Sequence, residues 1–190
     1  MEIDWKAQLG QDRFVVDVLG GKRDGTYVDI GAGHPTDISN TYVLETRFAW
    51  RGVLCEKDPS LLAEIMRRRA GNEVSTDALA ADWHSLFSKI AKDGWIDYLS
   101  LDLEPPDLTL EVLRRLPLGP FKFRVATVEH DAYRDGGHRR MMDMASIMYS
   151  HGYQCVGTAQ MKVDGELLSI EDWWVHEELG ITLSKQEDSK

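Results

Sequence analysis

The sequence predicts an α/β fold in which a mostly parallel β-sheet is covered by helices on both faces. Three observations support this class. Short apolar segments of strand character alternate with helical patterns over residues 27–153. Acids stand in or at the ends of several of these segments. The pair Asp164-Gly165, a hairpin signal, predicts an antiparallel strand added last. Alternating strands and helices build parallel sheets through right-handed crossovers.

The first part of the chain contains two predicted strands and two predicted helices. Residues 11–19 have apolar side chains at helical spacing and stop at Gly20-Gly21. Residues 27–30 are a short buried strand. A helix is expected over 39–48, with Ser39 or Asp37 as its N-cap. Residues 52–56 form a second apolar strand that ends in an acid.

The middle of the chain continues the alternation. Pro59 stands where a helix begins, and the segment LLAEIMRRR continues that helix. The third strand is the weakest signal, and residues 74–78 are its candidate. A helical pattern over 79–92 is closed by Gly94. A strand over 96–103 and a helix over 108–116, stopped by Pro117, follow.

The last part predicts the end of the sheet. A strand over 123–128 is followed by a helix over 137–151, which Gly152 ends. Residues 153–157 predict a strand. The segment 161–170 predicts a hairpin of two short strands, and 172–176 predicts a final strand in which Trp173 and Trp174 point to opposite faces.

Length and charge restrict the organisation and the partners. A chain of 190 residues predicts one domain over 1–190, with an N-terminal helical segment over 1–22 and a disordered polar tail over 184–190. The net charge of −10 argues against nucleic acid as a partner. No apolar run approaches the length of a membrane span, and the opening MEIDWKAQLG is no secretory signal, so we expect a cytoplasmic protein without a membrane partner. The oligomeric state is not predicted.

The stretch YVDIGAGHP, residues 27–35, places a glycine-rich turn directly after the first strand. A phosphate-binding P-loop needs Gly-Lys-Ser/Thr, and a dinucleotide fingerprint needs a third glycine; neither is present. Small residues here still allow a ligand to approach the backbone closely. An NAD-dependent oxidoreductase is therefore only a minor alternative.

Acids recur at one edge of the predicted sheet. Asp29 lies in the first strand, and Glu56, Asp102 and Glu129 stand at or near the ends of three later strands. The carboxyl ends of parallel strands form the ligand edge of an α/β sheet. A carboxylate after the second strand can accept hydrogen bonds from both ribose hydroxyls. The alternative is that these acids are ordinary helix caps and turn residues.

Six segments in order resemble the FkbM family of S-adenosylmethionine-dependent methyltransferases. They are QLGQDRFV, GTYVDIGAGHPTDISNTYVLE, WRGVLCEKDP, IDYLSLDLE, VATVEHD and DWWVH, between about residues 8 and 179. The resemblance implies a Rossmann-like, seven-stranded methyltransferase sheet, mostly parallel, with a late antiparallel strand. It also implies S-adenosylmethionine as cofactor and a hydroxyl on a sugar, glycan or small metabolite as methyl acceptor.

The resemblance also implies roles for individual residues. Glu56 would bind the ribose, Lys57 would border the adenosine, and Asp102 would meet both donor and acceptor. The full cofactor set that it implies is Gln11, Asp29, Gly31, Ala32, His34, Ser39, Asn40, Glu56, Lys57, Asp77, Ala78 and Asp102. Within this set, Ser39 and Asn40 would open a helix whose amides hold the cofactor carboxylate.

Two departures from the family pattern concern the acceptor side and the adenine side. Pro105-Pro106 replaces the expected glycine-containing loop after Asp102-Leu103-Glu104, so that loop is stiffer. The region between residues 69 and 95 is shorter than in the family. A protein that binds S-adenosylmethionine without catalysis therefore remains an alternative.

Methyl transfer to a hydroxyl needs alignment and a base. The candidate catalytic residues are Asp102, Glu129 and His130, and His130 has the alternative role of a capping or core histidine. A divalent cation is a further option, because carboxylates with a histidine suit magnesium or manganese. Its candidate ligands are Asp102, Glu104, Glu129 and His130.

Overall fold

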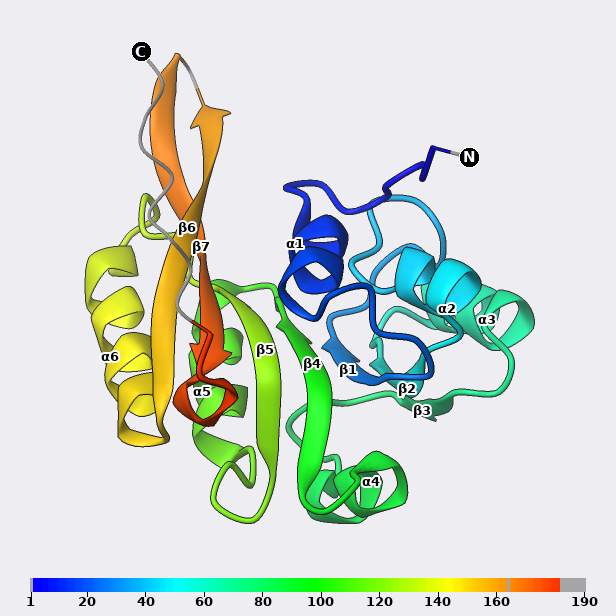
Figure 1. Ribbon diagram of the computed structural model, residues 1–190. Coiled ribbons are helices and arrows are strands. Elements are labelled where there is room, and N and C mark those ends of the chain that lie inside the picture. The colour runs from blue at the N-terminus through cyan, green and yellow to red at the C-terminus, as the bar shows by residue number, and fades with distance from the viewer. Residues whose placement is uncertain (1, 164, 182–190) are drawn as a thin grey trace.

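Seven strands form one mixed sheet in the computed structural model, which describes residues 2–163 and 165–181 (Figure 1). The strands are β1 (Thr26–Ile30), β2 (Arg51–Cys55), β3 (Glu73–Ser75), β4 (Trp95–Leu101), β5 (Lys122–Glu129), β6 (Tyr153–Val163) and β7 (Glu166–His176). The helices are α1 (Gln11–Val18), α2 (Tyr42–Phe48), α3 (Pro59–Arg68), α4 (Trp83–Ile90), α5 (Pro106–Arg115), α6 (Gly137–Ser150) and the 3₁₀ turn η1 (Glu177–Leu179).

The strand order is β3-β2-β1-β4-β5-β7-β6, and only β7 runs against its neighbours β5 and β6. This arrangement confirms the predicted mostly parallel sheet with a late antiparallel strand. The chain leaves β1 toward β2 on one side and reaches β4 on the other, so the sheet has its switch point between β1 and β4. Ligands of open α/β sheets bind beyond the carboxyl ends of the strands at such a point.

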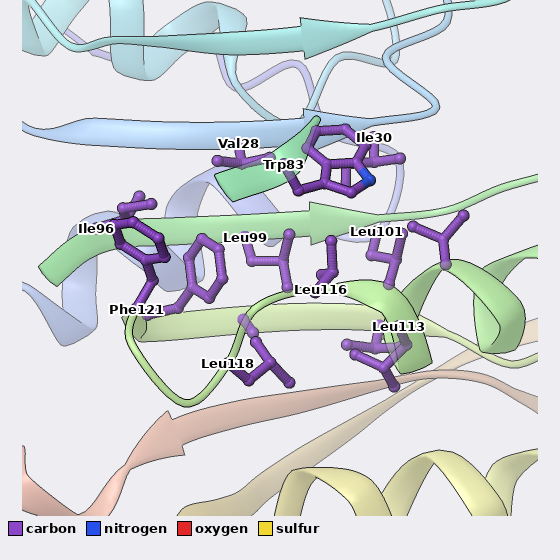
Figure 2. Close-up of a cluster of buried hydrophobic side chains, with 14 of the residues drawn as sticks. Val28, Ile30, Trp83, Ile96, Leu99, Leu101, Leu113, Leu116, Leu118 and Phe121 are labelled. Atoms are coloured by element: carbon purple, nitrogen blue, oxygen red, sulfur yellow. The ribbon is translucent and has the colours of Figure 1, made fainter. Parts of the chain in front are cut away.

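Two apolar layers hold the helices on the sheet, one on each face. Side chains of α1, α2 and α3 pack with Tyr27, Leu54 and Tyr98. On the opposite face, side chains of α4 and α5 pack with the neighbouring positions Val28 and Leu99 (Figure 2). Side chains of α6 belong to the same apolar cluster. Successive side chains of a strand point to opposite faces, which explains why strands buried on both faces are apolar without interruption.

The hairpin of β6 and β7 extends beyond the sheet (Figure 1). Both strands have 11 residues, but β7 pairs with β5 only from Glu171 to Val175. The prediction of several short strands over 153–176 was therefore wrong, because the two strands continue through bulges near Gly157 and Gln160. Asp164 of the predicted turn lies outside the described residues, as does the tail 184–190.

Three helix predictions differ from the structure at their ends. The helix expected over 39–48 begins only at Tyr42, because residues 36–41 form a loop in which Ile38 has a left-handed backbone. The helix expected over 79–92 is limited to Trp83–Ile90, with Asp82 as its cap. The helix expected from residue 108 already begins at Pro106, since proline suits the first helical position. None of the helices in the described ranges is long and apolar enough to cross a bilayer.

Candidate functional site

The loop after β1 brings the backbone close to β4 at the switch point. The amides of Gly31 and Ala32 donate to the carbonyl of Cys55 at 2.9 and 3.0 Å, which extends the pairing with β2. A Cβ atom on Gly31 would lie 1.6 Å from the carbonyl oxygen of Asp102, so a larger residue would force β1 and β4 apart. Gly31 also has a φ of 86°, a conformation that favours glycine.

A first cavity of about 300 Å³ lies beyond the carboxyl ends of β1, β2 and β4. We call it the donor cavity, after the role that is proposed for it below. Its lining residues are Gly31, Cys55, Glu56, Lys57, Thr76, Asp77, Ala78, Leu79, Asp102, Leu103, Glu104 and Leu108. The Glu56 carboxylate is fixed by two amides, those of Gly33 at 2.9 Å and Asp58 at 2.7 Å. Each carboxylate oxygen keeps a free lone pair, so Glu56 can still accept two hydroxyl hydrogen bonds.

The buried guanidinium of Arg69 fastens the loop that follows β1. Arg69 stands directly after α3 and is 1% exposed. Its nitrogens donate to Pro35 O, Ser39 Oγ and Thr41 Oγ1 in the loop, and to Tyr27 and Glu45 outside it. Thr41 in turn donates to Asp29 at 2.6 Å. Burial raises the pKa of Asp29, which Thr41 and Arg69 oppose.

A second cavity, of about 250 Å³, adjoins the first, since Asp102 and Glu104 line both. We call it the acceptor cavity, after the role that is proposed for it below. Its lining residues are Gln8, Leu9, Gln11, Ile38, Asn40, Asp102, Glu104, Glu129, Asp131, Tyr133, Arg134, Met161 and Ile170. The N-terminal segment forms one wall and is held in place by the buried Asp12, which accepts from the amides of Lys6 and Ala7 at 2.7 and 3.2 Å.

Asp102 lines both cavities, and the carboxyl of Glu129 lies close to it in the second. Burial raises the pKa of both carboxyls, and for Glu129 the neighbouring negative charge of Asp102 raises it further. Two neighbouring carboxylates repel each other when both are ionised. The pair therefore keeps one proton at pH values above the ordinary pKa of a carboxyl. Such a pair can take up a proton near neutral pH.

His130 is turned away from both cavities. It is 1% exposed, its Nδ1 accepts from the amide of Ala132 at 3.1 Å, and its Nε2 lies 3.6 Å from Asp172. Within residues 2–163 and 165–181, no three His, Cys, Asp or Glu side chains are placed to hold a metal ion. The four residues predicted as metal ligands do not form one site. His130 faces inward, and Glu104 forms an ion pair with Arg134.

The residues of the predicted cofactor set lie in three kinds of environment. Most line a cavity: Gly31, Glu56, Lys57, Asp77, Ala78 and Asp102 the first, and Gln11, Asn40 and Asp102 the second. Asp29, Ala32 and Ser39 are buried and line neither. His34 closes the turn by accepting from the amide of Asp37 at 3.0 Å. The helix expected to begin with Ser39 and Asn40 begins only at Tyr42, so the amides of these two residues belong to a loop and not to a helix N-terminus.

Sequence reasoning did not select Asp131, Tyr133, Arg134 or Gln8 as site residues. Asp131 follows Glu129-His130 in the segment VATVEHD, so strand-end position alone was a usable signal for it. Tyr133 and Arg134 lie in an irregular loop that ends at Gly136, and Gln8 is placed by tertiary contacts. No local pattern indicates these three.

Comparison with known proteins identifies the fold. No family model matches the sequence, and no curated protein matches it. Among solved structures, a Bacillus subtilis tRNA (m1A22) methyltransferase has a TM-score of 0.51 at 12% identity, over 92% of this chain and 68% of the other. The Synechocystis magnesium protoporphyrin IX methyltransferase with bound S-adenosylmethionine has 0.53 at 12%, over 87% and 77%. The Methanococcus jannaschii fibrillarin pre-rRNA processing protein has 0.57 at 17%, over 82% and 68%.

These similarities show the Rossmann-like fold of S-adenosylmethionine-dependent methyltransferases. They also correct the exclusion of nucleic acid, which was wrong. Solved structures with this fold are described as tRNA and rRNA methyltransferases, so a net charge of −10 does not exclude nucleic acid as a partner. Net charge sums over the whole surface, whereas a nucleic acid contacts only one face.

Proposed function

We propose that this protein is an S-adenosylmethionine-dependent methyltransferase of the FkbM type that methylates a hydroxyl oxygen of a sugar, glycan or small metabolite. The observation that carries the proposal is the position of Glu56. Its carboxylate follows β2, is held by two backbone amides, and faces a cavity at the switch point of a methyltransferase fold. A carboxylate there is suited to the ribose hydroxyls of the cofactor.

The residues around this cavity fit the remainder of the cofactor. Ala78, Leu79 and Leu108 give the cavity an apolar side suited to an adenine ring. Gly31 leaves room for the backbone approach between β1 and β4. Asp102 lines both cavities, and its carboxylate would stabilise the positive sulfonium of a bound cofactor.

When bound, S-adenosylmethionine supplies a methyl group that is already activated by the sulfonium. The protein then has to align the acceptor oxygen and remove its proton. The Asp102–Glu129 pair lines the second cavity and would take up the proton of the acceptor hydroxyl there. His130, the third candidate, has no contact with either cavity and is not assigned a role.

The direct test is methyl transfer from S-adenosylmethionine, followed by release of S-adenosylhomocysteine. The acceptor panel contains monosaccharides, oligosaccharides, small hydroxylated metabolites and RNA, whose 2′-hydroxyls are also acceptors of this chemical type. Turnover with a hydroxylated acceptor that is lost in Asp102→Asn and Glu129→Gln supports the proposal. Methylation of a nitrogen would replace the hydroxyl assignment and keep the donor.

A further inference from the structure

We propose that the acceptor cavity binds an acceptor that carries a positively charged amino group beside its hydroxyls, such as an amino sugar. This inference rests on the proposed function for the identity of the ligand as methyl acceptor. Its structural basis is the cavity itself, which combines an acidic floor, an apolar rim and one protein cation.

Even with one proton held between Asp102 and Glu129, the acids on the floor of the cavity carry more negative charge than Arg134 neutralises. Asp102, Glu104, Glu129 and Asp131 all line it, and Arg134 is the one cation among its lining residues. Arg134 forms two hydrogen bonds with Glu104, at 2.9 and 2.7 Å. In the described part of the chain, no lysine, arginine or histidine forms an ion pair with Asp102 or Glu129.

Asp131 shares the cation Arg134 with Glu104, and one of its carboxylate oxygens has no hydrogen bond. Its side chain is 2% exposed, and Oδ2 makes no hydrogen bond. The nearest cation atom is Arg134 Nε, 2.8 Å away, which forms an ion pair without the direction of a hydrogen bond and belongs to a side chain that is 41% exposed. A buried carboxylate oxygen without a donor is unfavourable, and an ammonium group would supply one.

The rim is apolar and exposed. Ile38 is 66% exposed and Tyr133 38%, and both line the cavity together with Leu9 and Met161. Ile38 and Tyr133 are among the few large apolar side chains that are exposed on the described surface. A tyrosine ring and aliphatic groups around an acidic floor suit a ring with an apolar face and a charged substituent. A phosphate-rich ligand would meet repulsion at this floor.

The test compares three probes of equal ring structure and different charge: glucosamine, N-acetylglucosamine and glucose. Each sugar is titrated at millimolar concentration and at a pH below the amine pKa of glucosamine. The amide chemical shifts of the isotope-labelled protein are followed by NMR. We expect glucosamine to shift the amides of residues 102–104 and 129–134, with affinity about tenfold or more above both neutral probes. Equal shifts with glucose, or no shifts at these amides, would overturn the proposal.

Three variants separate charge recognition from damage to the fold. Glu104→Gln and Asp131→Asn should weaken glucosamine binding, whereas Arg134→Gln should strengthen it by removing the competing cation. A structural defect does not produce this reversal of sign. Glu178→Gln, which alters a carboxylate paired with Lys122 at the opposite edge of the sheet, is the matched control and should leave binding unchanged.

Titration of the same samples with S-adenosylhomocysteine keeps the two proposals distinguishable. If the protein prefers glucosamine but does not bind S-adenosylhomocysteine, the site for an amino group stands and the methyltransferase proposal is overturned. Binding of S-adenosylhomocysteine without preference for glucosamine would retain the donor site and overturn the amino-bearing acceptor.

Discussion

At the scale of single residues, the acids at the carboxyl edge divide into three environments. Glu56 is held by amides and faces the donor cavity, Asp102 and Glu129 share a proton, and Asp29 is buried beneath the loop. The position of all four acids near one edge of the sheet was predictable from the sequence, because apolar runs show where strands end. It could not separate their roles, since these depend on partners such as Thr41 and Gly33 that only the fold brings close.

The Asp102–Glu129 pair gives a prediction that needs no acceptor. Replacing Asp102 with asparagine removes a negative neighbour, so the pKa of Glu129 should fall toward its ordinary value. NMR titration of the carboxyl carbons of wild type and Asp102→Asn measures the change. An unaltered Glu129 titration would show that the two carboxyls are not coupled.

Glu171 gives a prediction about stability and pH. It is 1% exposed, and burial raises the pKa of its carboxyl to about 8. The folded state therefore binds the proton more tightly than the unfolded chain, and stability falls as pH rises from about 4.5 to about 8. The slope is at most about 1.4 kcal/mol per pH unit.

Glu171→Gln should flatten this dependence and raise the free energy of unfolding at alkaline pH. The amide oxygen can still accept from Trp173 Nε1, which lies 2.6 Å from Glu171 Oε1. Urea unfolding at several pH values tests this, with Glu166→Gln on the exposed part of β7 as the control. Equal slopes for wild type and Glu171→Gln would contradict a protonated buried carboxyl.

At the scale of elements, regular segments were predictable and their ends were less so. β1, β2, β4 and β5 have apolar residues on both faces, and such runs are hard to mistake. The start of α2 was missed because residues 36–41 are held by the side chain of Arg69, which is remote in sequence. Local propensity carries no information about such a contact.

Arg69 gives the prediction at this scale. Arg69→Met leaves Glu45 and the loop without their buried cation, so the free energy of unfolding should fall by about 3–5 kcal/mol. S-adenosylhomocysteine binding should weaken as well, because the loop after β1 loses its tether. Arg69→Lys should restore part of both.

Calorimetric titration and urea unfolding measure the two effects on the same variants. A loss of stability with unchanged S-adenosylhomocysteine affinity in folded Arg69→Met would show that the tether does not position the cofactor loop. Arg67→Met, which alters an exposed pair with Glu64 on α3, is the control and should change stability by less than about 1 kcal/mol.

At the scale of the whole molecule, the order of the seven strands decides where the chemistry lies. The switch point between β1 and β4 opens the donor cavity, and the neighbouring β4 and β5 carry Asp102 and Glu129 to the boundary with the acceptor cavity. The sequence predicted this sheet, but the acceptor cavity also needs the N-terminal segment and β6, which come together only in the folded chain.

Calorimetric titration with S-adenosylhomocysteine measures directly whether the donor cavity binds the methyl donor. We expect micromolar binding to wild type and no comparable binding of NAD. Glu56→Gln should weaken S-adenosylhomocysteine by about 100-fold through loss of charge-assisted bonds to the ribose, while Glu178→Gln should bind like wild type. If S-adenosylhomocysteine does not bind, or binds Glu56→Gln as tightly as wild type, the donor cavity is not the cofactor site.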